Sequence, residues 1–168
     1  MSLSKKLVVV AVSAMAVVGF TASSAMADTA VMVNNPGTVQ LHSSSSVLTS
    51  SGTPIANCDV VIDATLSTGG IASGVSFTIT GPGLCSSITA SSTGGAICND
   101  GSSDYLKAQV TVNLFGSPVA SGNITGGITS TQLTFANSQI GSSSAAIDGV
   151  YDADPELELE ATEDACSI

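Results

Sequence analysis

The segment from Asn57 to Ala90 constrains the fold most, because it combines two alternating apolar patterns with two cysteines. In its first half every second residue is apolar or cysteine: Cys58, Val60, Ile62, Ala64 and Leu66. In its second half Val75, Phe77 and Ile79 alternate with small or polar residues, chiefly serine and threonine. A period of two is typical of a strand with one buried face. The segment therefore predicts two paired β-strands, joined by a glycine-rich turn at 67–74.

The same period recurs along the chain, most cleanly between Leu106 and Leu114. Shorter strands are expected at 30–33, 38–41, 84–90, 119–125, 128–135 and 145–150, with an edge strand possible near Leu157 and Leu159. The serine-rich segment 43–54 and the segment 91–104 are interpreted as loops, and Gly126-Gly127 as a hairpin turn. Turn signals about every 8–12 residues favour packed sheets. The fold class we expect is all-β: an antiparallel β-sandwich of about eight short strands with two disulfides.

The N-terminal residues have the pattern of a secretory signal peptide. Lys5 and Lys6 precede an uncharged apolar run at 7–20, and Ala25-Met26-Ala27 is an A-x-A cleavage site. We expect a cleaved signal peptide at 1–27 and a single β-sandwich domain with an acidic C-terminal tail at 28–168. The apolar run is too short for a membrane span. The expected location is secreted or at the cell surface, with the periplasm as the alternative.

Four cysteines follow the expected cleavage site: Cys58, Cys85, Cys98 and Cys166. An even number in an exported chain indicates two disulfide bonds, for which three pairings are possible. The pairing we favour is Cys58–Cys85 with Cys98–Cys166. A zinc site is the competing interpretation, but no two of the cysteines are close in sequence and the one histidine is remote from them.

The charge balance restricts the partners. All thirteen acidic residues follow the expected cleavage site, whereas Lys107 is the one lysine or arginine that does, giving a net charge of about −12. Nucleic acid and anionic lipid need cationic side chains and are therefore excluded as partners. Tryptophan is absent and aromatic residues make up 4% of the chain, which argues against a sugar-binding platform.

Candidate catalytic and metal-binding residues are few. His42, beside the serines at 43–46, is the one histidine available as the base of a hydrolase, and a solvated loop histidine is the simpler interpretation. Two acidic segments carry oxygen ligands suited to calcium, with Asp100 and Asp104 in one and Asp152 and Asp154 in the other. Neither matches an EF-hand loop, and a solvated acidic surface is the simpler interpretation. We therefore expect no catalytic residue, no resident metal and no cofactor.

Three runs of sequence resemble the activators of alkane oxidation, a family of small exported bacterial proteins. These runs are N-C-D-V-V-I-D-A-T at 57–65, V-S-F-T-I-T-G-P-G-L-C-S-S-I-T-A at 75–90 and G-N-I-T-G-G-I-T-S-T-Q-L-T-F at 122–135. The similarity extends from Gly37 to Val150 and is sharpest over 81–90. The resemblance implies a surface or secreted protein that helps cells use water-insoluble hydrocarbon and is connected with biofilm matrix. It carries over no catalytic residue.

These observations together predict a non-enzymatic exported protein acting at the cell surface or in the extracellular matrix, in hydrophobic substrate use, biofilm or adhesion. The expected partners are a second copy, through exposed edge strands, or a hydrophobic substrate. The alternative is a calcium-dependent binding module or a small hydrolase.

Overall fold

The computed structural model describes residues 28–166, and the expected signal peptide at 1–27 lies outside them. This part of the chain forms ten strands and one short 3₁₀ turn, η1. The strands are β1 (Thr29–Val33), β2 (Gly37–Ser50), β3 (Thr53–Leu66), β4 (Ile71–Thr80), β5 (Ile88–Asn99), β6 (Asp104–Leu114), β7 (Ser117–Ile128), β8 (Gln132–Gln139), β9 (Ala145–Asp154) and β10 (Leu159–Ala165), with η1 (Gly83–Ser87) between β4 and β5. The fold is therefore all-β, as predicted.

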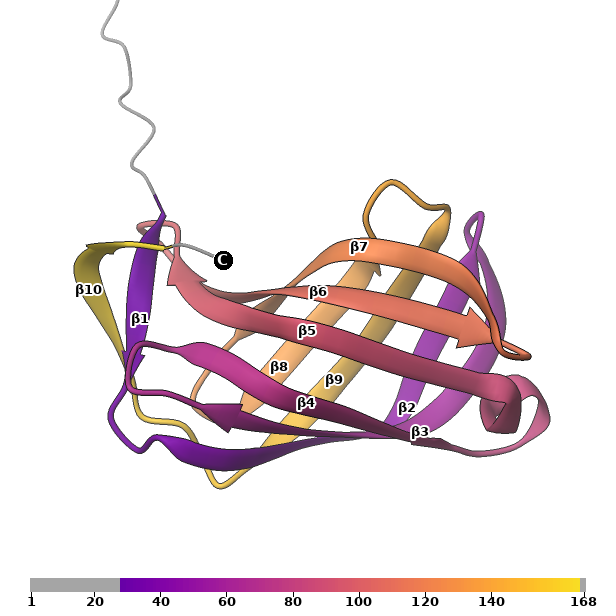
Figure 1. The fold of residues 1–168 in the computed structure, drawn as a ribbon, viewed down its shortest axis with the longest axis horizontal. Helices are drawn as coiled ribbons and strands as arrows, with labels where there is room; N and C mark the ends of the chain where they lie inside the picture. Colours follow the sequence, from indigo (N-terminus) through magenta and orange to yellow (C-terminus); the bar gives the residue numbers. More distant parts are fainter. Residues whose placement is uncertain (1–27, 167–168) are drawn as a thin grey trace, which may run out of the picture.

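The eight strands β2 to β9 form a closed antiparallel barrel (Figure 1). Each strand pairs with the next one in the chain, and β2 pairs with β9 from Gln40↔Asp154 to Ser50↔Ala145 to complete the ring. The prediction of a sandwich was wrong, because the sheet curls until its first and last strands meet. The alternating apolar pattern specifies that each strand has one buried face. Strands have one buried face in a sandwich and in a barrel alike, so the pattern does not distinguish the two folds.

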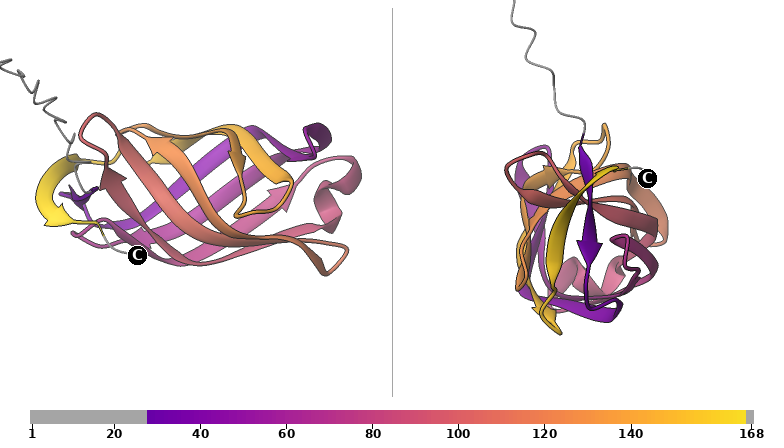
Figure 2. Two further views of the ribbon diagram at one scale, coloured as in Figure 1. Left: turned by 90° about the horizontal axis from the view of Figure 1, so that it is seen from above. Right: turned by 90° about the vertical axis from the view of Figure 1, so that its left-hand side faces the viewer.

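Strands β1 and β10 lie outside the ring and cross one end of the barrel as an antiparallel pair (Figure 2). Two residue pairs, Thr29↔Asn99 and Ala30↔Cys98, join β1 to β5. The side chains of Val31 and Val33 have no exposed surface. This strand pair therefore covers one end of the apolar interior.

Both disulfides are present with the favoured pairing. Cys58–Cys85 joins β3 to η1, and Cys98–Cys166 joins β5 to the residue that follows β10. Two disulfides are consistent with an extracellular or periplasmic protein. Between residues 28 and 166 no helix is long and apolar enough to cross a membrane.

The strands are longer than the sequence pattern predicted. The segment 43–54 is not a loop, because β2 continues to Ser50 and β3 begins at Thr53. Likewise β5 runs to Asn99 and leaves only a short turn before β6, while Gly126 and Gly127 lie inside β7. Serine, threonine and glycine are typical of turns, but here pairing with a neighbouring strand outweighs their local preference.

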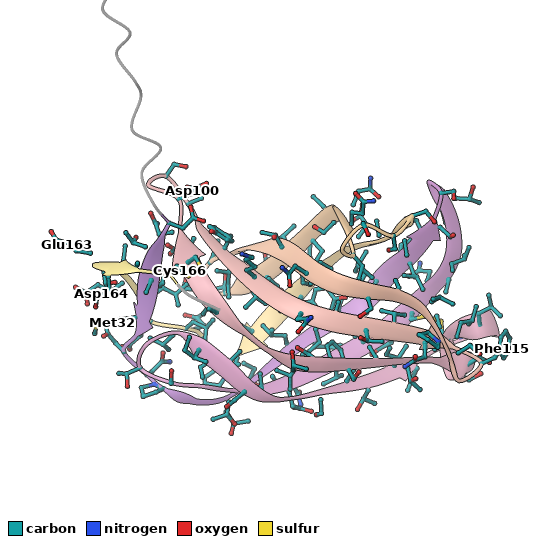
Figure 3. The ribbon with its side chains drawn as sticks, turned by 45° about the horizontal axis from the view of Figure 1, so that its top comes forward. Met32, Asp100, Phe115, Glu163, Asp164 and Cys166 are labelled. Carbon is teal, nitrogen blue, oxygen red and sulfur yellow. A yellow bond between two sulfur atoms is a disulfide. The ribbon has the colours of Figure 1, made fainter. Side chains whose placement is uncertain are left out.

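The two ends of the barrel differ in charge (Figure 3). The end crossed by β1 and β10 carries Asp100, Glu163 and Asp164, and Phe115 lies at the opposite end. At the Phe115 end, the connections 51–52, 81–87, 115–116 and 140–144 contain no charged residue. Phe115 is 70% exposed at the tip of the β6–β7 hairpin.

Candidate ligand cavity

The inward faces of the barrel strands enclose an apolar cavity of about 100 Å³. Its wall includes six large aliphatic side chains from four strands: Val60, Ile62, Val110, Val112, Ile124 and Leu133. Their period of two places them on the same face as smaller neighbours such as Ala64 and Ala108, which also line the cavity. Eight-stranded barrels have an interior that side chains either fill or leave open for one small ligand. Here the small side chains leave part of the interior unfilled.

Ser46 and Tyr151 bring one side-chain hydrogen bond to this wall. The Ser46 Oγ and Tyr151 Oη atoms are 2.5 Å apart, and Tyr151 is 2% exposed. The register of β2 against β3 shifts between Ser43 and Ser46, which marks a bulge before Ser46. The ring of Phe135 packs edge-on against Tyr151, with centroids 5.7 Å apart. Burial raises the pKa of Tyr151, and the hydrogen bond to Ser46 opposes that rise.

The hydroxyl groups of the wall all have partners within the protein. Ser92 is the third residue with a hydroxyl in the lining; its Oγ accepts from the Gly94 amide at 3.0 Å and donates to the Gly94 carbonyl at 3.3 Å. Across the described residues, no buried side-chain nitrogen or oxygen lacks a hydrogen-bond partner. A polar ligand would therefore lose its hydrogen bonds to water without gaining others, whereas an apolar ligand would not.

Of the candidate hydrolase residues, the structure places His42 beside an aspartate, and among the described residues no hydrogen bond joins His42 to a serine. His42 lies on the outer face of β2, where its Nε2 is 3.2 Å from Asp59 Oδ1 and both side chains are about half exposed. The neighbouring Ser43 is buried, because successive residues of a strand face opposite sides. The prediction of a loop histidine was wrong about the element, since His42 lies within β2, although its side chain is exposed.

Three of the four calcium candidates accept side-chain hydrogen bonds from other residues of the protein. Asp100 Oδ1 accepts from the Ser102 hydroxyl at 2.7 Å and from the Ser102 and Ser103 amides at 2.9 Å, and these bonds lower the pKa of Asp100. Asn99 Nδ2 donates to Asp104 Oδ1 at 2.7 Å.

In the other acidic segment, Gln132 Nε2 donates to Asp152 Oδ1 at 2.8 Å. Asp154 pairs through its backbone with Gln40 at the end of β9. In residues 28–166, no group of three or more histidine, cysteine, aspartate or glutamate side chains is placed to hold a metal ion.

The cavity was not predicted from the sequence. Ala64 and Ala108 occupy inward positions of the predicted strands and line the cavity. Their small side chains were the one feature of the sequence that indicated unfilled space in the interior. Whether that space becomes a cavity depends on how the sheet closes, and the alternating pattern does not specify the closure.

Comparison with known proteins found no matching family model, no matching curated protein and no matching solved structure.

Proposed function

We propose that this is a non-enzymatic exported protein that binds one small apolar molecule inside its barrel. The observation that carries the proposal is the cavity of about 100 Å³, whose wall is apolar and whose three hydroxyl groups already have protein partners. Apolar cavities of this kind stay free of water and take up small hydrocarbons. Binding would place apolar ligand surface against apolar side chains and remove it from water.

The cavity volume restricts the ligand. An apolar cavity of about 150 Å³ binds benzene, and one water occupies about 30 Å³ in the liquid. A cavity of about 100 Å³ therefore suits a short or cyclic hydrocarbon of benzene size or less. A longer chain needs the half-buried Phe77 and Ile79, which also line the cavity, to move outward.

The proposed setting is the cell surface or the extracellular matrix, where such a protein would serve hydrophobic substrate use. Two features support it: the two disulfides and the resemblance to activators of alkane oxidation. In a biofilm or adhesion role, another chain would pair with the free edge of β10. This strand ends the strand order and has one unpaired edge within the described residues. Fractionation of producing cells into medium, sheared surface material and periplasm tests the location.

Ligand binding is tested by thermal unfolding of the purified chain 28–168 with and without saturating benzene. A ligand that binds the folded state raises the melting temperature. Ala64→Leu places a larger side chain in the cavity and should abolish the shift, as should Ala108→Leu on a different strand. Ala136→Leu makes the same change on the exposed face of β8, and this variant should still show the benzene-induced shift in melting temperature.

The outcome that overturns the proposal is a wild-type melting temperature unchanged by benzene, together with unchanged NMR signals of the wall methyl groups. A shift that persists equally in both filled variants would place the ligand elsewhere and would also overturn it.

A further inference from the structure

The barrel wall is incompletely paired between β4 and β5. These strands form two residue pairs, Ile71↔Ala96 and Ala72↔Gly95, and the pairing then stops. Each strand is fully paired on its other side, β4 with β3 as far as Thr80 and β5 with β6 from Ile88 onward. The segments 73–80 and 88–94 therefore face each other without a hydrogen-bonded ladder; we call this gap the β4–β5 seam. At about 3.3 Å per residue it is roughly 25 Å long.

Side chains of the cavity wall are exposed along this seam. Val75, Phe77 and Ile79 on β4 and Ala90 on β5 line the cavity, yet all four are only half-buried. The inward residues of the fully paired strand β3 are buried throughout 58–66. The inner wall is therefore more exposed at the seam than at β3, and the lining residues Leu106 and Ala108 on β6 and Ile147 on β9 are half-buried too.

Strands β7 and β8 also share only a short ladder. Comparison with them shows that a small number of paired residues does not by itself expose the interior of the barrel. These strands share the pairs Gly127↔Thr134 and Ile128↔Leu133. There the connection at 140–144 folds back, and the Gly141 amide donates to the Asn123 carbonyl at 2.8 Å. Ile140, which lies in this connection, has no exposed surface. The β7–β8 gap is therefore sealed, whereas the β4–β5 seam is not.

Both ends of the seam are fixed. At one end are the two residue pairs of β4 with β5. At the other, η1 carries the chain from β4 to β5, and the Cys58–Cys85 disulfide ties η1 to β3 with a Cα–Cα distance of 5.6 Å. A gap held at both ends can widen in its middle without unfolding the barrel. Neither segment that borders it, 73–80 or 88–94, contains a charged residue.

From these contacts we propose that the β4–β5 seam is the portal through which an uncharged apolar ligand reaches the barrel cavity. This inference rests on the proposed function. The ligand passes between Val75, Phe77 and Ile79 on one side and Ala90 on the other, and Ser92 is the one polar residue of the two segments that lines the cavity. Its passage breaks no strand ladder, because none is present there.

A covalent bridge across the seam tests the portal. Ser76→Cys with Ser91→Cys places two thiols on the exposed faces of β4 and β5, and a short bis-maleimide joins them. The four native cysteines are all in disulfides and do not react. Benzene is the probe, and NMR exchange spectroscopy measures its association and dissociation rates. The bridge should slow both rates at least tenfold and leave the affinity within twofold.

The control bridge joins two strands that are already paired. Thr111→Cys with Ser121→Cys replaces two hydroxyls that lie 2.8 Å apart on β6 and β7, and bridging them should leave both rates unchanged. In the opposite direction, Phe77→Ala should speed exchange severalfold, whereas Phe115→Ala at the exposed hairpin tip should not.

Benzene exchange at the wild-type rate in the bridged β4–β5 protein overturns the portal and leaves the proposed function intact. Failure of the unbridged protein to bind benzene overturns both. Equal slowing by both bridges also overturns the portal, because it assigns the effect to general stiffening of the barrel.

Discussion

Ser46 and Tyr151 form the one hydrogen bond between two side chains of the cavity wall, so each hydroxyl depends on the other. Ser46→Ala should lower the free energy of unfolding by about 1–3 kcal/mol, because it leaves the buried Tyr151 hydroxyl without a partner. The double variant Ser46→Ala/Tyr151→Phe should recover part of that loss. Urea denaturation of the two single variants and the double variant measures the coupling.

The control for this cycle is the exposed pair Thr111 and Ser121, whose hydroxyls also bond to each other. Changing both to alanine should alter stability by less than about 0.5 kcal/mol. If the losses of unfolding free energy in the Ser46 and Tyr151 single variants simply add up in the double variant, the two hydroxyls do not depend on each other. That result would contradict the prediction.

Burial of Tyr151 also predicts how stability depends on pH. Its pKa is raised in the folded protein, chiefly by burial, whereas in the unfolded chain a tyrosine ionises near pH 10. Above about pH 10 the folded state therefore holds more protons than the unfolded state, so stability falls as pH rises. The contribution of neutral Tyr151 to the stability of the folded protein is complete below about pH 10. It is lost as the pH rises through the pKa that Tyr151 has in the folded protein.

Tyr105 adds to this alkaline loss, because desolvation and its hydrogen bond to Asp28 raise the pKa of Tyr105 to about 12. Urea midpoints measured on both sides of about pH 10 check the prediction. Tyr151→Phe should flatten the decline, and an unchanged slope in that variant would contradict it.

At the scale of elements, the alternating pattern predicted which residues face inward more reliably than where strands end. Every inward residue predicted for 58–66 is buried on β3. Strand ends were missed in the serine-rich part of β2 and at Gly126-Gly127 in β7, where local turn preference gives way to pairing with a neighbouring strand. The cavity and the β4–β5 seam could not be predicted, because both depend on contacts between strands after the barrel closes.

The Cys98–Cys166 disulfide holds β10, and through it β1, against the barrel end. Its two cysteines are 68 residues apart in sequence, so in a chain-entropy model it stabilises the folded protein by about 4 kcal/mol. Replacing both with alanine should raise hydrogen–deuterium exchange in β1 and β10 much more than in β6, which pairs along its length with β5 and β7. Mass spectrometry of peptides from these strands measures the difference.

The matched control is the pair Cys58→Ala/Cys85→Ala, which should loosen η1 and the neighbouring end of β3 and leave β10 protected. An equal rise in exchange over all strands in both double variants would instead indicate that the protein unfolds only as one unit.

At the scale of the molecule, the charge is concentrated at the end crossed by β1 and β10. Residues 28–168 carry a net charge of about −12, so repulsion among these carboxylates opposes the folded state. Glu163→Gln/Asp164→Asn, at two exposed positions, should raise the melting temperature by about 2 °C at low ionic strength. Salt screens surface charges within about 10 Å at 0.1 M, so the difference should shrink as salt is added.

Scanning calorimetry at two salt concentrations checks this prediction. A double variant that melts lower than the wild type at low salt would show that Glu163 and Asp164 make favourable contacts that outweigh their repulsion.

Closure of the barrel by β2 and β9 has a consequence for the order of folding. Strand β2 begins at Gly37, but its closing partner begins only at Ala145, so most of the chain must be synthesised before the ring can form. Contacts between residues so distant in sequence form slowly. Until then, β2 and the last completed strand each present an unpaired edge, the arrangement to which another chain adds most readily. A nascent or truncated chain that ends before Ala145 is therefore the form of this protein most prone to aggregate.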